Sequence, residues 1–238
     1  MISSVDASAY ALVHGVRRTR KTLAVWQQRP WPVVRRWLAG SLAAAWFLLL
    51  AIWLVSVTAS GRGAVAPIRP PFLVGGPGDV ARILAHNLLV LTLHAMACVA
   101  GFIAGSSLPL QAAYRSGLSR TIHEAGRRIA IAFVVCATCF SLSLQAYAIG
   151  TSAAHVAFAL HVSPALLLIG LLPHAVPELV ALFLPLAACI IASRRGEWDQ
   201  LLAATLVTVA MALPILGVTA VWEVYAAPHV LGSLLGYA

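Results

Sequence analysis

The sequence predicts an all-α fold, a bundle of transmembrane helices that crosses a lipid bilayer several times. Hydrophobic residues make up 61% of the chain, charged residues make up 10%, and the mean hydropathy is +0.91. A water-soluble domain of this length seldom has such a composition. A helix needs about 20 apolar residues to cross a bilayer core about 30 Å thick. Apolar runs of about that length cover residues 38–59, 83–106, 129–150 and 201–221.

The positions of the basic residues predict the topology. The net charge of +9 would also fit a nucleic-acid partner if the basic residues formed a patch. Most of them instead flank the apolar runs, and we place these on the cytoplasmic side, where loops carry an excess of Lys and Arg. Only Arg62, Arg69 and Arg82 then face outward. We therefore expect anionic lipids as partners and no nucleic acid. The residues placed inside are Arg17, Arg18, Arg20, Lys21, Arg29, Arg35, Arg36, Arg115, Arg120, Arg127, Arg128, Arg194 and Arg195.

Residues 1–37 are predicted to form a basic arm at the cytoplasmic membrane surface, ahead of a transmembrane helical domain over residues 38–238. Trp26, Trp31 and Trp37 are interleaved with basic residues. Trp and Arg are typical of the headgroup region, so an interfacial helix is favoured over an independent domain. The polar region before the first apolar run is too long for a signal peptide, and this run is interpreted as a signal anchor.

An external loop is predicted over residues 60–82. Its many prolines and glycines exclude a regular helix or strand. The loop is either a simple connector or a surface that contacts a partner outside the cytoplasm.

The second apolar run contains polar residues at its start and small residues near its end. His86 and Asn87 open the run, and Ala97, Gly101 and Gly105 follow at intervals of four. Small residues at that spacing share one helix face and let a neighbouring helix approach closely. We therefore predict that these three residues pack against another helix.

The four cysteines all lie in predicted membrane segments, where we expect no disulfide. Cys136 and Cys139 have a spacing found in redox and metal sites, but no second pair accompanies them. Packing residues in a helix are the preferred interpretation.

Residues 151–193 form a longer apolar stretch that contains two prolines near its middle. A straight helix of that length would rise about 65 Å, which is too long for one crossing. We predict a broken helix over residues 155–193, with the break at residues 173–178, because proline removes backbone donors. Two full spans that meet at the break are the alternative. A single crossing keeps the two arginines after it inside, so residues 155–172 are predicted to be re-entrant or horizontal. The result is about five spans, with the N-terminus inside and the C-terminus outside.

Glu178 is the first candidate contact residue, since a carboxylate at an apolar span is costly and usually has a role. Pro177 is predicted at the start of a helix, where Glu178 would interact with the positive end of the helix dipole. His174 would share a helix face with Glu178. Glu223 lies among aromatic residues at the end of the last run. These residues either stabilise a helix break and a boundary, or converge with His86 and Asn87 to contact a partner, an ion or a substrate.

No catalytic, cofactor-binding or metal-binding residues are predicted. The sequence contains no HExxH, GxSxG, P-loop or GxGxxG pattern, and no two histidines are three or four residues apart. We therefore predict no cofactor and no enzymatic activity.

Two short motifs resemble the stage II sporulation protein M family. The segment at 173–179, Pro-His-Ala-Val-Pro-Glu-Leu, resembles that family's Pro-His-Gly and Glu-Leu pattern, with Ala175 in place of the glycine. The segment at 222–228 resembles its last span, which ends in an acidic residue, an aromatic residue and a proline. His86 and Asn87 look like its Asn-Asn pair. The resemblance covers about residues 84–230.

This resemblance implies a multi-pass protein of the prokaryotic cytoplasmic membrane that is linked to cell-envelope remodelling and has no known enzymatic activity. The leading hypothesis is a membrane scaffold or assembly subunit that forms a complex with other membrane proteins, with a homo-oligomer as a further option. The alternative is a transporter or permease subunit with its site at the broken helix. A third hypothesis, an intramembrane hydrolase, would use Glu178 and His174 with a metal.

Overall fold

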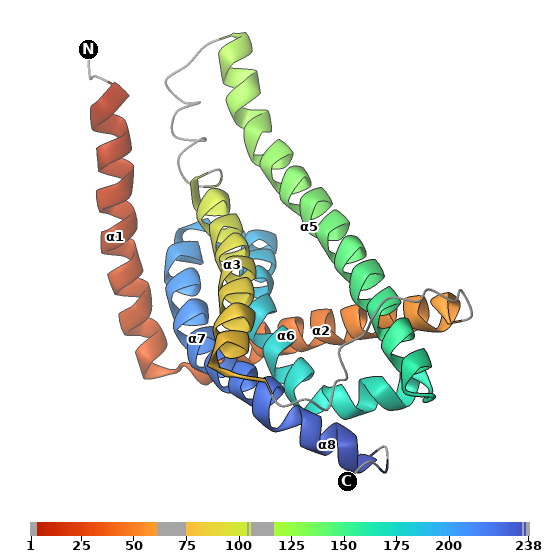
Figure 1. Cartoon of the computed structure of the whole chain (residues 1–238). Coiled ribbons are helices and arrows are strands. Elements are labelled where there is room, and N and C mark those ends of the chain that lie inside the picture. Colours follow the sequence, from red (N-terminus) through yellow and green to blue (C-terminus); the bar gives the residue numbers. More distant parts are fainter. Residues whose placement is uncertain (1–3, 61–74, 104, 106–116, 235, 237–238) are drawn as a thin grey trace. The chain divides into compact units, whose positions relative to one another are not determined.

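The computed structural model describes residues 4–60, 75–103, 105, 117–234 and 236, and for residues 4–14 and 118–131 it describes the backbone alone. All secondary structure in these ranges is helical, which confirms the predicted all-α class for them (Figure 1). The elements are α1 (Ser4–Gln28), α2 (Trp31–Ala59), α3 (Pro77–Phe102), α5 (Leu118–Ala159), α6 (Pro164–Arg195), the 3₁₀ turn η2 (Trp198–Gln200), α7 (Leu201–Tyr225) and α8 (Ala227–Leu234).

Five helical stretches within the described ranges are long and apolar enough to cross a membrane. The number agrees with the predicted five spans. The bounds of these stretches differ from those of the corresponding apolar runs by several residues. The stretches are Trp31–Ala59, Pro77–Phe102, Ala132–Ala159, Pro164–Arg195 and Trp198–Tyr225.

The chain divides into two compact units, and the divisions fall inside helices. Unit 1 contains Met1–Ser41, Leu91–Cys136 and Phe183–Met211. Unit 2 contains Leu42–Val90, Ala137–Leu182 and Ala212–Ala238. Among the described residues, unit 2 holds one basic residue, Arg82, and unit 1 holds all the others. The two units therefore differ sharply in charge.

In unit 1, α1 packs against the segment around η2. Arg18 forms an ion pair with Asp199. At Gly15 an added Cβ would lie 2.9 Å from the ring of Phe102 and 3.3 Å from Leu202, so the helices approach closely there. The predicted arm is thus a helix, α1, that contacts the rest of unit 1 through its own side chains.

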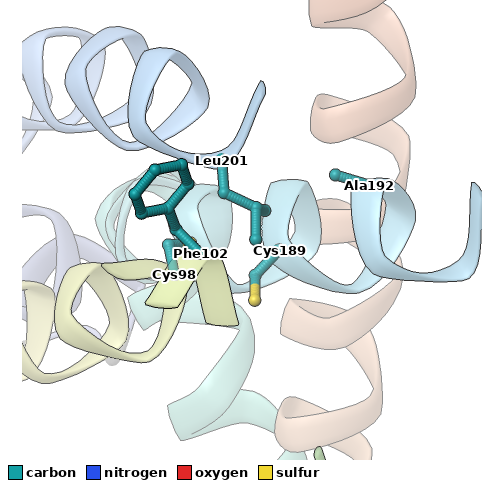
Figure 2. Packing of buried hydrophobic residues seen from close by; sticks show 5 residues of the cluster. All are labelled: Cys98, Phe102, Cys189, Ala192 and Leu201. Carbon is teal, nitrogen blue, oxygen red and sulfur yellow. The ribbon is translucent and has the colours of Figure 1, made fainter. Parts of the chain in front are cut away.

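A second contact in unit 1 joins α3, α6 and α7 through a cluster of buried residues (Figure 2). The Cys98 thiol donates a hydrogen bond to the backbone oxygen of Pro185 at 3.0 Å. The Cys189 thiol lies 3.9 Å from the backbone oxygen of Ala97. Both cysteines are free and buried, and they fill space between helices. The cluster consists of Cys98, Phe102, Cys189, Ala192 and Leu201.

The glycines of α3 and its continuation lie against bulky side chains of the same unit. A Cβ at Gly101 would lie 3.2 Å from Leu201, and a Cβ at Gly105 would overlap the Trp198 ring. A side chain at residue 105 would therefore clash with Trp198, whereas one at residue 101 would need a small shift of Leu201. Ala97 is partly buried and presents its carbonyl oxygen to Cys189.

In unit 2, α5 packs closely against α2 at Gly150. A Cβ there would lie 2.7 Å from Val55 and 2.8 Å from the backbone oxygen of Ile52. Further along α5, small residues and leucines form a buried cluster with α6 and α8. The cluster consists of Ala153, Ala157, Leu160, Leu167 and Leu231.

The helix break predicted at residues 173–178 is wrong, because α6 is helical from Pro164 to Arg195. The chain instead turns at residues 160–163, between α5 and α6, where His161 has a φ of 55°. The Ser163 hydroxyl accepts a hydrogen bond from the Leu166 backbone amide at 3.2 Å and Pro164 begins the helix, a typical helix start.

The prolines predicted to break the helix lie inside it and do not end it. Pro173 and Pro177 lie inside α6, where each removes one backbone hydrogen bond and the neighbouring turns keep theirs. Figure 1 shows the first turns of α6 running in a different direction from the turns that follow. The third apolar run also extends further than predicted, since α5 continues through residues 151–159, which contain no glycine or proline.

Two further predicted boundaries change. The external loop was predicted to reach residue 82, but α3 begins at Pro77, where proline suits the first turn and Asp79 suits the helix dipole. The boundary between arm and membrane domain, predicted at residues 37 and 38, falls inside α2, which begins at Trp31 after the break at Pro30. Residues 61–74 of the loop lie outside the described ranges.

Candidate functional site

Five polar side chains of unit 2 gather where α3, α6 and α7 meet. We call Asp79, Arg82, Asn87, Glu178 and Glu223 the polar cluster. Its central contact joins α3 to α6: the Asn87 amide donates a hydrogen bond from Nδ2 to Oε1 of Glu178 at 3.0 Å. Asn87 is 4% exposed and Glu178 is half-buried. The contact therefore holds a half-buried acidic side chain.

Glu178 does not occupy the helix start that the sequence predicts for it. Because α6 begins at Pro164, Glu178 lies about 20 Å along the helix. The helix dipole acts mainly within the first turn, so it does not account for a carboxylate there. The interpretation of Pro177 and Glu178 as a helix cap is thus wrong, and Asn87 supplies the polar contact instead.

His174 lies one turn before Glu178 on the same face of α6. It is 6% exposed, and its Nδ1 atom is buried without a hydrogen-bond partner in the part of the chain that the structure describes. A buried polar atom without a partner costs about 1–3 kcal/mol. His174 is therefore the least satisfied polar side chain near Glu178.

Glu223 on α7 is half-buried and lies within electrostatic range of both Glu178 and Arg82. Its charge is repelled by Glu178 and attracted by Arg82. The described part of unit 2 contains three carboxylates, on Asp79, Glu178 and Glu223, and one basic side chain. The cluster thus carries an excess of negative charge when its carboxylates are ionised.

The start of α3 is tied to the end of α7. Arg82 donates a hydrogen bond from Nη2 to Oδ1 of Asp79 at 2.8 Å, and Asp79 accepts a second one from the Gly76 amide at 3.0 Å. The Gly75 amide donates to the backbone oxygen of Val224 at 3.4 Å. These bonds position Arg82 near Glu223.

The structure brings some of the predicted contact residues together and leaves others apart. Asn87, Glu178 and Glu223 lie in one cluster, with His174 on the adjoining helix turn. His86 and Pro177 are exposed. The predicted packing residues Ala97, Gly101 and Gly105 belong to unit 1 and not to this cluster.

Asp79 and Arg82 were not predicted as site residues. The sequence does contain a signal for them, since Pro77 followed by Asp79 is a typical helix start. A helix beginning there would have placed Arg82 a little more than one turn before Asn87.

The cluster offers carboxylate and amide oxygens to a ligand. Such groups can hold a proton, a cation or a basic side chain of a partner. No group of three or more His, Cys, Asp or Glu side chains suited to a metal ion occurs in the searched part of the chain.

Comparisons of the chain with protein-family models, curated proteins and solved structures gave no match.

Proposed function

We propose that the chain is an integral membrane protein that acts as an assembly subunit, binding other membrane proteins through surfaces within the bilayer. The exposure of α5 carries this proposal. Only 6% of the apolar window in Ala132–Ala159 is buried, against 56% in Pro164–Arg195. Polar side chains on α5, including Ser141 and Ser143, are also exposed. Polar groups on a transmembrane helix usually face another helix, because lipid offers them no hydrogen bonds.

The proposed orientation has the N-terminus inside and the C-terminus outside the prokaryotic cytoplasmic membrane. The described basic residues assigned to the inside all belong to unit 1, and Arg82, assigned to the outside, belongs to unit 2. The positive-inside rule, which places an excess of Lys and Arg in cytoplasmic loops, supports this assignment. The exposed basic residues of α1 and α2, including Arg17, Arg20 and Arg35, would then bind anionic lipids.

Five crossings also require that α6 crosses only once. Its 32 residues would rise about 48 Å, well beyond the bilayer core. We propose that the turns before Pro173 lie in or near the interface and that the turns after it cross. This retains a horizontal first segment, as the sequence suggested, in a helix that is bent and unbroken.

The resemblance to the stage II sporulation protein M family supports an assembly role in the cell envelope over a reaction. Its main motif, at residues 173–179, contains His174 and Glu178, which lie beside or in the polar cluster. We propose that this cluster contacts a basic side chain of a partner, since it carries more acidic than basic groups.

Photocrosslinking in the native membrane tests the assembly role. A photoreactive amino acid at Leu144, which is 53% exposed on α5, should give a defined crosslink to another membrane protein. The matched control is Leu186, which is 5% exposed, and it should give no crosslink. If Leu144 crosslinks only to lipid and the gently purified chain carries no stoichiometric partner, the assembly role is wrong.

A transporter or permease subunit is the second candidate, and the unpartnered Nδ1 of His174 beside Glu178 favours it. Polar groups next to a bent helix often form substrate or ion sites in membranes. Reconstituted flux that is lost in Glu178→Gln and kept in His86→Gln, with both proteins folded, would place this function first. Absence of flux for protons and monovalent cations would remove it.

A further inference from the structure

Helix α5 presents two distinct faces within unit 2. One face packs against the chain's own helices through small residues, and these are buried. They are Ala146, Gly150, Ala153 and Ala157. The other face is exposed or only partly covered by the described part of the chain, although it carries polar groups.

The other face follows a heptad-like spacing. Its residues are separated by three, four, three and four positions, and none of them is buried. This average of 3.5 residues per turn is the spacing that keeps one seam of a helix against a partner helix over its whole length. The residues are Thr138, Ser141, Gln145, Ala148 and Ser152. We call them the α5 seam.

Gln145 lies at the centre of the seam. Its Nε2 donates a hydrogen bond to the Ser141 hydroxyl at 3.2 Å. A carboxamide has a second N–H and a carbonyl oxygen besides the N–H that this bond uses. In hydrocarbon these groups gain from a partner helix, where interhelical hydrogen bonds replace the missing water.

We propose that the α5 seam binds the α5 seam of a second copy of this chain, so that two α5 helices cross the membrane side by side in parallel. This deepens the proposed assembly role, on which it rests, by naming one partner.

The chemistry of the seam selects a second copy. Two copies inserted with the same orientation are related by a two-fold axis along the membrane normal, which places each seam residue opposite itself. Gln145 therefore meets Gln145 of the second copy. A carboxamide is both donor and acceptor, so two of them pair without any other group. A single polar residue at such a seam also fixes the register of the two helices.

The size of the remaining seam residues permits the contact. Thr138, Ser141, Ala148 and Ser152 are small, and small residues let the two backbones approach. The large exposed side chains Phe140 and Tyr147 lie on a different face of α5, seven residues apart. They would face lipid in the proposed pair.

Disulfide crosslinking in vesicles of phosphatidylethanolamine and phosphatidylglycerol tests the pair. The starting protein has Cys136→Ala and Cys139→Ala, which removes the exposed thiols and leaves the two buried ones. Ser141→Cys places a thiol on the seam, and Phe140→Cys places one beside it on another face. Under a mild oxidant, Ser141→Cys should give a crosslinked dimer and Phe140→Cys should give monomer. Equal crosslinking of both variants, or none in either, overturns the proposal.

A measurement of dimer affinity in the same vesicles gives a second test. Gln145→Leu should weaken the dimer roughly tenfold, because it removes the interhelical amide pair. Tyr147→Leu, off the seam, should leave the affinity unchanged. Unchanged affinity in Gln145→Leu also overturns the proposal.

The two proposals fail in different ways. A purified chain that stays monomeric in vesicles but crosslinks to another protein from Leu144 in the native membrane contradicts the α5 pair and keeps the assembly role. A chain that pairs through the α5 seam and has no other partner keeps the pair and contradicts the binding of other membrane proteins.

Discussion

At the scale of single residues, Asn87 is the side chain on which the position of Glu178 most depends. Asn87→Leu removes the hydrogen bond to the carboxylate and leaves Glu178 half-buried without it. We expect a loss of about 1.5–3 kcal/mol in the free energy of unfolding, the usual value for a hydrogen bond to a charged group. The matched control is His86→Leu at the exposed neighbouring position, which should change it by less than about 0.5 kcal/mol. Unfolding followed by circular dichroism in detergent measures both, and equal effects would contradict the role given to Asn87.

Glycines in unit 2 give a second prediction for single residues. Gly150→Ala places a Cβ 2.7 Å from Val55 and 2.8 Å from a backbone oxygen, so we expect a loss of about 1–3 kcal/mol. Gly217→Ala, on α7, meets nothing within 4 Å and should be neutral or stabilise the protein by up to about 1 kcal/mol. The same unfolding measurement compares the two. A stabilising Gly150→Ala would show that α5 and α2 are further apart than described.

The residues of the polar cluster were partly predictable from the sequence. Glu178 and Glu223 stand out because carboxylates are rare in apolar segments. Their proximity to Asn87 depends on three helices that are distant in sequence, and no local pattern encodes it. Asp79 and Arg82 were missed because the prolines and glycines before them suggested a loop, although Pro77 is a helix start.

At the scale of the elements, the apolar runs predict where the helices lie. The helix-start signals predict more closely where each helix begins. An apolar run of about 20 residues is a strong signal of a transmembrane helix, because that length just crosses the bilayer core. The prolines at 173 and 177 predict a break that α6 does not have. A proline inside a long apolar helix can bend the helix without ending it. Ser163 followed by Pro164 marked the true boundary.

The position of that boundary can be tested at Ser163. Ser163→Ala removes the hydroxyl that accepts the Leu166 amide, so we expect a loss of about 1 kcal/mol in stability. Ser233→Ala, where the hydroxyl only bonds a carbonyl of its own helix, should have a smaller effect. Thermal unfolding in detergent compares the two variants. If Ser163→Ala has no effect, Ser163 does not cap α6.

At the scale of the whole molecule, composition alone was enough to predict a multi-span helical protein, and the five candidate spans agree with that prediction. The exposure of the α5 seam was not predictable, because it depends on which face of α5 the rest of the chain covers. The apolar runs give the number of helices, whereas the packing of small residues such as Gly150 decides which faces remain open.

The proposed orientation depends on an odd number of crossings, and accessibility of single thiols in intact cells tests it most directly. Starting from the Cys136→Ala and Cys139→Ala protein, Arg195→Cys follows the span in α6, and Ser233→Cys follows the span in α7; both sites are exposed. A membrane-impermeant maleimide should label Ser233→Cys in intact cells, and it should label Arg195→Cys only after the membrane is permeabilised. Labelling of Arg195→Cys from outside, or protection of Ser233→Cys, would contradict five crossings with the C-terminus outside.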